Sequence, residues 1–213
     1  MPINRAFFFQ QIRTSLFTNK LSQGQVDGIN FILDEWESRH AGKDDRWLAY
    51  ALGTAFHETA FKMQPIDEFG SSAYFERRYG PFGDKPQRAR ANGNTEAGFG
   101  AKYHGRGYVQ LTWKNNYAAM SAVLSLAFGK SIDLVANPDE AKLPAYAAVI
   151  MFHGMEHGTF TGRKFADYFT AKPNGQPDKD DWVGARKIIV GTDHDIDIAA
   201  YGRKFYAALS YLH

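Results

Sequence analysis

Two carboxylates in the first third of the chain have the types and the spacing for acid–base chemistry. Glu58 follows His57 near the end of a stretch with helical periodicity, and Glu68 comes 10 residues after Glu58. Glycosidic bond hydrolysis needs such a pair, because one acid protonates the leaving oxygen while a base activates water on the opposite face of the sugar. Acid pairs at this spacing are common, so the pair alone does not decide the chemistry.

Glu58 occupies a position that suits a general acid. At 3.6 residues per turn it lies one turn beyond Ala51 and Ala55, at the edge of the buried stripe of its helix. Burial and the dipole at a helix C-terminus both disfavour the ionised carboxylate. The alternative is a solvated or salt-bridged glutamate at a helix end.

Motifs for metals and nucleotides begin in this sequence but are incomplete. A zinc-protease motif would need a second histidine where Phe61 stands. The aspartates at 193, 195 and 197 begin like a calcium loop, but Ile198 replaces the required glycine. The Gly-Arg-Gly of residues 105–107 lacks the third glycine of a dinucleotide loop. We therefore expect no metal and no cofactor.

The stretch 103–117, Tyr-His-Gly-Arg-Gly-Tyr-Val-Gln-Leu-Thr-Trp-Lys-Asn-Asn-Tyr, combines turn glycines with a strand-like run. It offers the polar groups of Gln110, Thr112 and Asn116 beside aromatic side chains, a usual way to hold a sugar. Other roles are open for some of these residues: Gln110 and Asn116 could brace a hairpin, and Arg106 could hold the loop by hydrogen bonds.

Helices must position these groups, and helical periodicity is clear towards both ends of the chain. Ser22 and Gln25 fit a capping box, and Gly129 is a helix stop. The predicted helices are about 3–16, one starting at Ser22, one starting at Asp44 or Asp45, 113–128, a long one after Asn137-Pro138, 182–190 and 195–209.

The middle of the chain differs. Residues 79–107 are rich in Gly, Pro, Asn and Arg and have almost no apolar periodicity, which predicts a structureless segment of functional or disordered character. Whether residues 79–102 close over a substrate stays open. The predicted fold class is mainly α, with a small loop or β-hairpin lobe near the middle.

Composition removes several classes of protein. The 213 residues include no cysteine, which excludes disulfide scaffolds, cysteine metal sites and thiol nucleophiles. The net charge of +2 suits an anionic partner without requiring one, and we expect no nucleic acid partner. We see no signal peptide and no apolar run long enough for stable membrane insertion. We expect a monomer made in the cytoplasm.

Four motifs in order resemble glycoside hydrolase family 19, the chitinase group that includes many phage lysozymes (endolysins). They are His57-Glu58-Thr59, Glu68, the Gly-Arg-Gly-Tyr-Val-Gln-Leu-Thr of residues 105–112, and Asn116-Tyr117. The resemblance covers most of residues 56–209. Residues 1–45 form an N-terminal helical part without a motif, and we expect residues 1–213 to be a single catalytic domain.

The resemblance implies a lysozyme-like, two-lobed, mainly α fold and an inverting mechanism. Glu58 matches the family's general acid, Glu68 its general base, and Thr112 the hydroxyl that positions water. Sugar-binding positions match Gln110 and Asn116, with His57 and Tyr103 as weaker candidates. In an inverting enzyme the two carboxyls stand roughly 6.5–9.5 Å apart.

Some features leave alternatives open. Glu76 is a rival base, although its neighbouring arginines favour an ordinary ion pair, and His57 could simply be exposed. Ala60-Phe61 replaces glycines that often follow this motif, and Val190-Gly191 replaces an Asn-Gly. These departures, with the missing disulfides of plant chitinases, put chitin specificity in doubt.

The sequence thus predicts an endolysin or lysozyme that hydrolyses the β-1,4 bonds of peptidoglycan glycan strands. We expect it to act on the cell wall or in the periplasm after release through a holin-type pore. The alternative is a chitinase that cleaves chitin oligomers with the same chemistry. An inactive glycan-binding protein is less favoured, because both Glu58 and Glu68 are retained.

Overall fold

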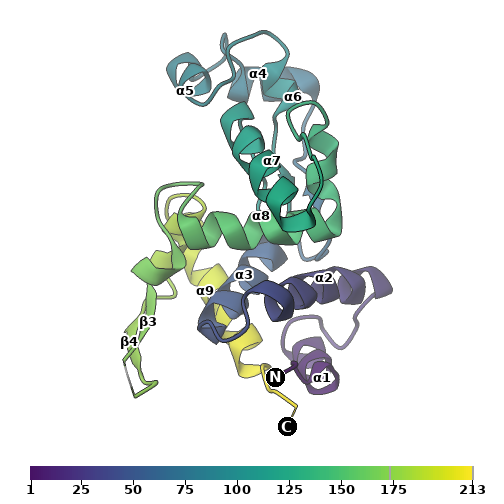
Figure 1. Ribbon diagram of the computed structural model, residues 1–213, viewed down its shortest axis with the longest axis vertical. Coiled ribbons are helices and arrows are strands. Elements are labelled where there is room, and N and C mark those ends of the chain that lie inside the picture. The colour runs from purple at the N-terminus through teal and green to yellow at the C-terminus, as the bar shows by residue number, and fades with distance from the viewer. Residues whose placement is uncertain (173, 213) are drawn as a thin grey trace. The chain divides into compact units, whose positions relative to one another are not determined.

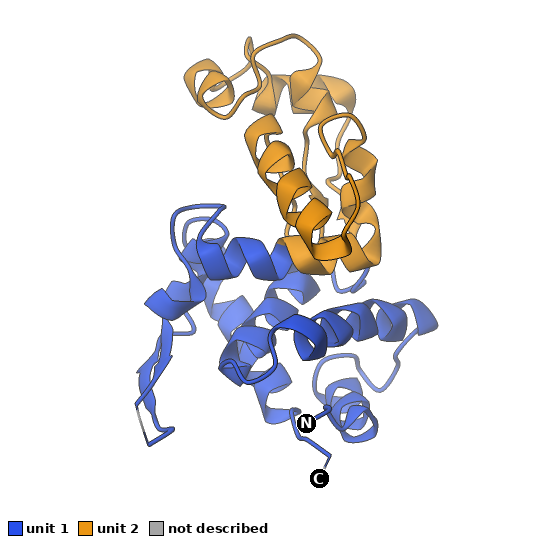
Figure 2. Cartoon of the chain, in the orientation of Figure 1, with its two compact units in different colours: residues 1–64, 151–213 blue, residues 65–150 orange. Residues whose placement is uncertain are grey.

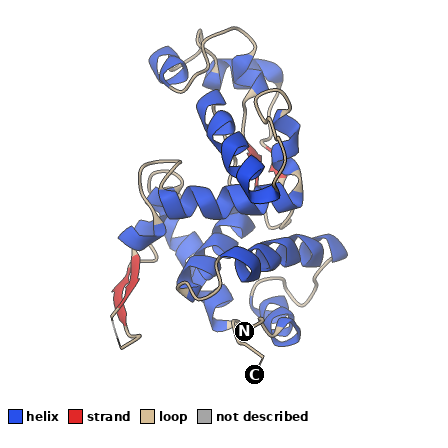
Figure 3. Cartoon of the chain, in the orientation of Figure 1, coloured by secondary structure: helices blue, strands red, loops and turns tan. Residues whose placement is uncertain are grey.

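The computed structural model describes residues 1–172 and 174–212 of the chain (Figure 1). Most of the regular secondary structure in these residues is helical, which confirms the predicted mainly α class (Figure 3). The chain divides into two compact units (Figure 2). Unit 1 comprises residues 1–64 and 151–213, and unit 2 comprises residues 65–150.

Unit 1 is built around two helices that approach each other closely. A Cβ added to Gly53 would lie 2.7 Å from the backbone nitrogen of Gly202, so the glycines let helix α3 and helix α9 pack backbone to backbone. The elements of this unit are α1 (Arg5–Ser15), α2 (Gln23–Arg39), α3 (Asp45–Glu58), β3 (Phe169–Ala171), β4 (Pro177–Asp180), α9 (Asp195–Ala207) and two 3₁₀ segments, η2 (Phe165–Asp167) and η3 (Gly184–Ile188). Helix α8 (Pro144–His157) contributes its residues 151–157.

Local signals set the helix starts in unit 1. Ser22 caps α2 and forms the predicted capping box with Gln25. Asp44 caps α3 by accepting a hydrogen bond from the backbone N–H of Arg46. The predicted apolar stripe of α3, which includes Ala51 and Ala55, is fully buried. The start of the helix that carries Glu58 is therefore explained by its own sequence.

Unit 2 contains a very short antiparallel pairing of distant segments. Strand β1 (Ile66–Asp67) pairs with β2 (Arg106–Gly107), with Asp67 opposite Arg106. The predicted hairpin is a tight one, in which Arg106 and Leu111 exchange backbone hydrogen bonds of 3.1 and 2.8 Å. The helices of this unit are α4 (Ser72–Tyr79), α5 (Pro86–Ala91), α6 (Phe99–Lys102), α7 (Lys114–Phe128), the 3₁₀ segment η1 (Pro138–Lys142) and residues 144–150 of α8.

The prediction of a structureless segment over residues 79–107 is wrong. The segment holds α5 and α6, and the buried Asn94 fixes it in place. The amide of Asn94 donates to the carbonyls of Tyr79 (3.0 Å) and Phe99 (3.3 Å). Its oxygen accepts the first-turn N–H of Lys114 at 3.0 Å, which caps α7. A polar side chain thus orders a segment that has no apolar pattern.

Replacing Asn94 with alanine is expected to lower the free energy of unfolding by about 2–4 kcal/mol, because three backbone groups around a fully buried position lose their partner. Thermal unfolding monitored by circular dichroism measures the loss. Asn92→Ala is the matched control, since the Asn92 side chain makes a single local hydrogen bond, to the carbonyl of Arg88. Equal stability losses in the two variants would contradict the role given to Asn94.

Three further features of the structure differ from the sequence prediction or were not part of it. The residues after Asn137-Pro138 form η1, and α8 begins at a second proline, Pro144, because the extended Leu143 before it interrupts the helix. Residues 182–190 form the short η3 instead of an α-helix. The strands β3 and β4 were not predicted, because β4 is exposed along its whole length and shows no alternation. In the part of the chain that the structure describes, no helix has the length and apolar character to cross a membrane.

Candidate active site

Glu58 is the last residue of α3, and its carboxylate is paired. Its side chain is 16% exposed, and Oε1 accepts a hydrogen bond of 2.6 Å from Nη1 of Arg186. Arg186 comes from η3, is almost fully buried, and donates from Nε to the carbonyl of Asp193 at 2.8 Å. The salt-bridged alternative for Glu58 is therefore what the structure shows, with a buried arginine as the partner.

The loop after Glu58 has an unusual backbone. Ala60, Phe61 and Met63 all have positive φ (48°, 65° and 54°), the region that glycine adopts most readily. Thr59 holds the turn, because its hydroxyl donates to the carbonyl of Ala55 at 2.7 Å and accepts the N–H of Met63 at 2.9 Å. The replacement of glycines by Ala60-Phe61 is thus accommodated in a left-handed conformation.

The N-terminal part of the chain fastens this loop. Gln25 of α2 donates from Nε2 to the carbonyl of Phe61 at 2.9 Å, and Gln64 donates to the carbonyl of Gly24. Gly28 of α2 lies so close to the loop that an added Cβ would be 1.7 Å from the carbonyl oxygen of Met63. Residues without a recognisable motif therefore shape the backbone beside Glu58.

His57 is half-buried, and its ring lies 4.6 Å from the ring of His194. Burial disfavours the imidazolium and lowers the pKa of His57 below its usual value of 6.5. The side chain is neither in the core nor freely exposed. It remains a candidate for sugar contact as a neutral hydrogen-bonding group.

This lowered pKa predicts a pH dependence of stability. The unfolded chain binds the His57 proton more tightly than the folded protein does. The contribution of His57 to the free energy of unfolding is therefore fully present above the pKa of the unfolded chain and is lost as the pH falls through the lower pKa of the folded protein. We expect the melting temperature to fall between about pH 7 and pH 5, and His57→Gln to make that fall smaller. Melts of both proteins at about pH 8 give the reference; an identical fall in the variant would contradict the prediction.

Glu68 lies just after β1 and is held by groups from two other segments. Its Oε1 accepts a hydrogen bond of 2.9 Å from the hydroxyl of Tyr79, and Oε2 accepts the N–H of Gly105 at 3.2 Å. Burial, followed by the charge of Glu68, raises the pKa of Tyr79, so this phenol stays protonated and donates. The side chain of Glu68 keeps 19% exposure. The carboxylate is thus oriented and still accessible to water.

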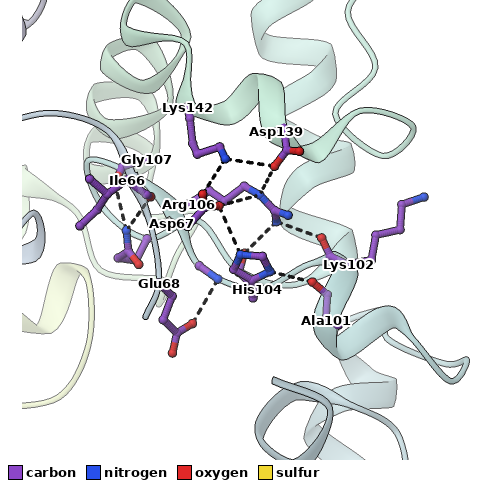
Figure 4. Close-up of polar contacts among 12 residues, drawn as sticks. Ile66, Asp67, Glu68, Ala101, Lys102, His104, Arg106, Gly107, Asp139 and Lys142 are labelled. Carbon is purple, nitrogen blue, oxygen red and sulfur yellow. Dashed lines mark hydrogen bonds and ion pairs between the residues drawn. The ribbon is translucent and has the colours of Figure 1, made fainter. Parts of the chain in front are cut away.

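A charged network holds the turn that carries Gly105 (Figure 4). Nε of Arg106 lies 3.0 Å from Asp139 and 3.4 Å from Asp67, and its Nη1 donates to the carbonyl of Lys102 at 2.9 Å. Lys142 donates to Asp67 at 2.6 Å. The side chain of Arg106 is only 8% exposed. The structure thus supports the role of holding the loop for Arg106.

The hydroxyl and amide candidates of unit 2 lie close to this turn. Gln110 has a positive φ of 54° and donates from Nε2 to the carbonyls of Ile66 (3.2 Å) and Gly107 (3.1 Å). A Cβ on Gly105 would lie 2.9 Å from Oε1 of Gln110 and 3.1 Å from Oε2 of Glu68, so the glycine brings these two side chains together. The Gln110 amide therefore braces the turn through its nitrogen, while its oxygen lies on the Glu68 side.

Thr112 and Asn116 follow on the same segment. The hydroxyl of Thr112 donates to the carbonyl of Gln110 at 2.8 Å, and the amide of Asn116 donates to the carbonyl of Thr112 at 2.9 Å. Both side chains are half-buried. Each keeps an oxygen that can accept a further hydrogen bond.

Two other candidates have structural roles. Tyr103 is 1% exposed, and its hydroxyl donates to the carbonyl of Val135 at 3.2 Å, so it belongs to the core and has no surface for a sugar. Glu76 does not form the expected ion pair with its neighbouring arginines. Its Oε1 accepts the N–H of Ala101 at 2.6 Å, which stabilises the start of α6.

Sequence reasoning missed Arg186 and Tyr79. Arg186 is 128 residues from Glu58, and no local pattern links the two. Tyr79 is 11 residues from Glu68 and carried no motif. Unit 1 holds His57, Glu58 and Arg186, and unit 2 holds the remaining candidates. Over residues 1–172 and 174–212, no group of three His, Asp or Glu side chains is arranged to hold a metal ion.

Comparisons with known proteins give structural neighbours only. No family model matches the chain, and no curated protein matches it by sequence. A chitinase C variant is 23% identical, with 75% of this chain and 68% of that chain covered and a TM-score of 0.46. Chitinase C from Streptomyces griseus is 22% identical (76% and 57% covered, TM-score 0.47), so this chain spans little more than half of that protein. A bacterial family 19 chitinase is 25% identical (73% and 68% covered, TM-score 0.43). The structures to which the chain is similar are thus named as chitinases, one of them as a bacterial family 19 chitinase.

Proposed function

We propose that this chain is a glycoside hydrolase that cleaves β-1,4 bonds of peptidoglycan glycan strands with inversion, Glu58 acting as the acid and Glu68 as the base. The observation that carries the proposal is the setting of Glu68. Its carboxylate is fixed by Tyr79 and Gly105, is partly exposed, and has the Gln110 amide beside the same glycine. A base that activates water needs an oriented carboxylate with free lone pairs in hydrogen-bond reach of the solvent.

The contact with Arg186 is consistent with Glu58 acting as the acid. With Oε1 paired to the guanidinium, Oε2 is the oxygen that takes up a proton and passes it to the leaving glycosidic oxygen. The transfer restores the ion pair between the Glu58 carboxylate and the buried cation. Arg186 therefore stabilises the charge that develops during the reaction.

The base step uses the residues of unit 2. Glu68 removes a proton from water as that water attacks the anomeric carbon, while the hydroxyl of Thr112 orients the same water. Gln110 and Asn116 hold the sugar through their remaining amide oxygens, and His57 contacts it as a neutral group. These roles follow from the family resemblance and match the free oxygens described above.

The proposal includes the setting in which the enzyme works. We propose a single catalytic domain that is made in the cytoplasm, reaches the cell wall after release and acts as a monomer. The absence of cysteine agrees with folding in a reducing compartment. The mildly basic chain agrees with an anionic wall polymer.

One experiment tests substrate and mechanism together. Purified peptidoglycan sacculi and N-acetylglucosamine oligomers are treated in parallel with the same enzyme, and turbidity and oligomer cleavage are followed. The expected result is faster cleavage of peptidoglycan, with the α-anomer as the first product in proton NMR. Faster oligomer cleavage would make the protein a chitinase, and a β-anomer would contradict inversion. No cleavage of either polymer would contradict the proposed activity.

A further inference from the structure

Positive charge is concentrated in one stretch of unit 2. Residues 74–114 contain eight Lys or Arg and three Asp or Glu, so this stretch carries a net charge of +5 while the whole chain carries only +2. The rest of the chain is therefore slightly acidic. The cations of this stretch include Arg78, Arg88 and Arg90, all of which are exposed.

Arg78 is the member of this group nearest to Glu68. Its Nε lies 3.9 Å from Oε1 of Glu68, and its guanidinium carbon lies 5.4 Å from the ring centre of Tyr79, the same tyrosine that donates to Glu68. Nη1 donates to the hydroxyl of Tyr74 at 2.9 Å. Despite these contacts the side chain is 57% exposed. The cation is thus positioned by aromatic rings and still presented to solvent.

Arg88 of α5 extends the same surface. Its guanidinium carbon lies 5.6 Å from the ring centre of Trp113. The ring of Trp113 meets that of Tyr79 edge to face, with 5.2 Å between their centres. Arg78 and Arg88 therefore stand over two neighbouring rings, and this pair of rings is connected to Glu68 through the Tyr79 hydroxyl.

An ordinary solvated charged face does not account for this arrangement. Within the described ranges, Arg88 has no carboxylate within 4 Å, and Arg78 reaches only the outer limit of an ion pair with Glu68. Both guanidinium groups are held over aromatic rings, which reduces the conformational freedom that they would lose on binding a ligand. A planar guanidinium with free donors matches a carboxylate.

We propose that Arg78 and Arg88 bind carboxylates carried by the glycan and so select an anionic substrate at Glu68. This inference rests on the proposed function and specifies its substrate. A chitin strand is neutral and offers no carboxylate to either guanidinium group. A glycan whose sugars bear peptides with free carboxylates supplies the missing anions beside the candidate base.

The test compares two forms of one polymer. Native peptidoglycan is compared with peptidoglycan whose peptide carboxylates have been converted to amides, so the glycan backbone is identical and only the charge differs. The quantity measured is the ratio of kcat/KM on the native form to kcat/KM on the amidated form. The proteins are the parent chain, Arg78→Gln/Arg88→Gln, and Arg78→Lys/Arg88→Lys. Arg163→Gln, at an exposed arginine of unit 1, is the control for removing a positive charge outside this stretch.

We expect the parent and Arg163→Gln to prefer the native form. In Arg78→Gln/Arg88→Gln the ratio of the two kcat/KM values should be roughly tenfold smaller than in the parent. The lysine variant keeps the charge and should retain part of it. The preference should also decline with added salt in the parent more steeply than in the glutamine variant. An equal ratio in the parent and the glutamine variant would overturn the inference while leaving the hydrolase intact. No turnover of either polymer by the parent would instead contradict the proposed function.

Discussion

Replacing Glu68 with glutamine is expected to reduce peptidoglycan turnover by roughly 10²- to 10⁴-fold, because glutamine cannot accept the proton of the attacking water. The fold should tolerate the change. Glutamine keeps one oxygen that can accept from Tyr79 or from Gly105, so about one hydrogen bond is lost. We expect the melting temperature to fall by no more than about 2–4 °C. Turbidity clearing of sacculi and thermal unfolding measure the two effects.

Glu76 provides the matched comparison for this prediction. Its carboxylate accepts the N–H of Ala101 at the start of α6, so Glu76→Ala should cost stability and leave turnover close to that of the parent. The two variants thus separate the roles of two acids 8 residues apart in the sequence. Normal clearing by Glu68→Gln, with lost clearing by Glu76→Ala, would move the base to Glu76.

Replacing Glu58 with glutamine is expected to reduce turnover on a similar scale, roughly 10²- to 10⁴-fold, because the leaving oxygen loses its proton donor. Here stability should fall as well. Arg186, whose side chain is 5% exposed, would keep a hydrogen-bond acceptor but lose its counter-charge. A buried cation without a counter-charge is costly, and the partial exposure of Glu58 moderates the effect to about 1–3 kcal/mol.

Glu58→Asp is the control for this second prediction. Aspartate retains the charge that Arg186 needs but withdraws the carboxyl by one methylene group. We expect it to lose most of the turnover and to keep more of the stability than Glu58→Gln. Unchanged clearing by Glu58→Gln would remove Glu58 as the acid. Equal melting temperatures for the parent and Glu58→Gln would show that the ion pair with Arg186 contributes nothing to stability.

The parts of the fold that local chemistry determines could be predicted. The Ser22–Gln25 capping box and the helix stop at Gly129 are found where the sequence places them. Helices α5 and α6 could not be predicted, because they are ordered by Asn94, a buried polar residue with partners in other segments. The β3–β4 pairing likewise depends on a distant residue, Arg46, which donates to the carbonyls of Thr170 and Lys179.

In the candidate site, too, local sequence predicts some residues, while others depend on contacts with distant segments. The motif identified Glu58 and Glu68 from their own neighbourhoods, but the partners of these acids come from other segments. No spacing rule connects Arg186 to Glu58 across 128 residues. Tyr103 shows the opposite error, since it lies beside the motif in the sequence and yet is buried in the core. Proximity in sequence thus indicates the candidate acids better than it indicates the residues that surround them.

The contacts between α2 and the loop after Glu58 limit how this protein can be rebuilt. Gln25 and Gly28 lie in the part of the chain that has no motif, yet they fasten the left-handed backbone at Phe61 and Met63. A chimera that joined only the motif-bearing region to a foreign N-terminal segment would leave this loop without its support. A chimeric protein built from this chain should therefore take residues 1–64 from it as one uninterrupted segment.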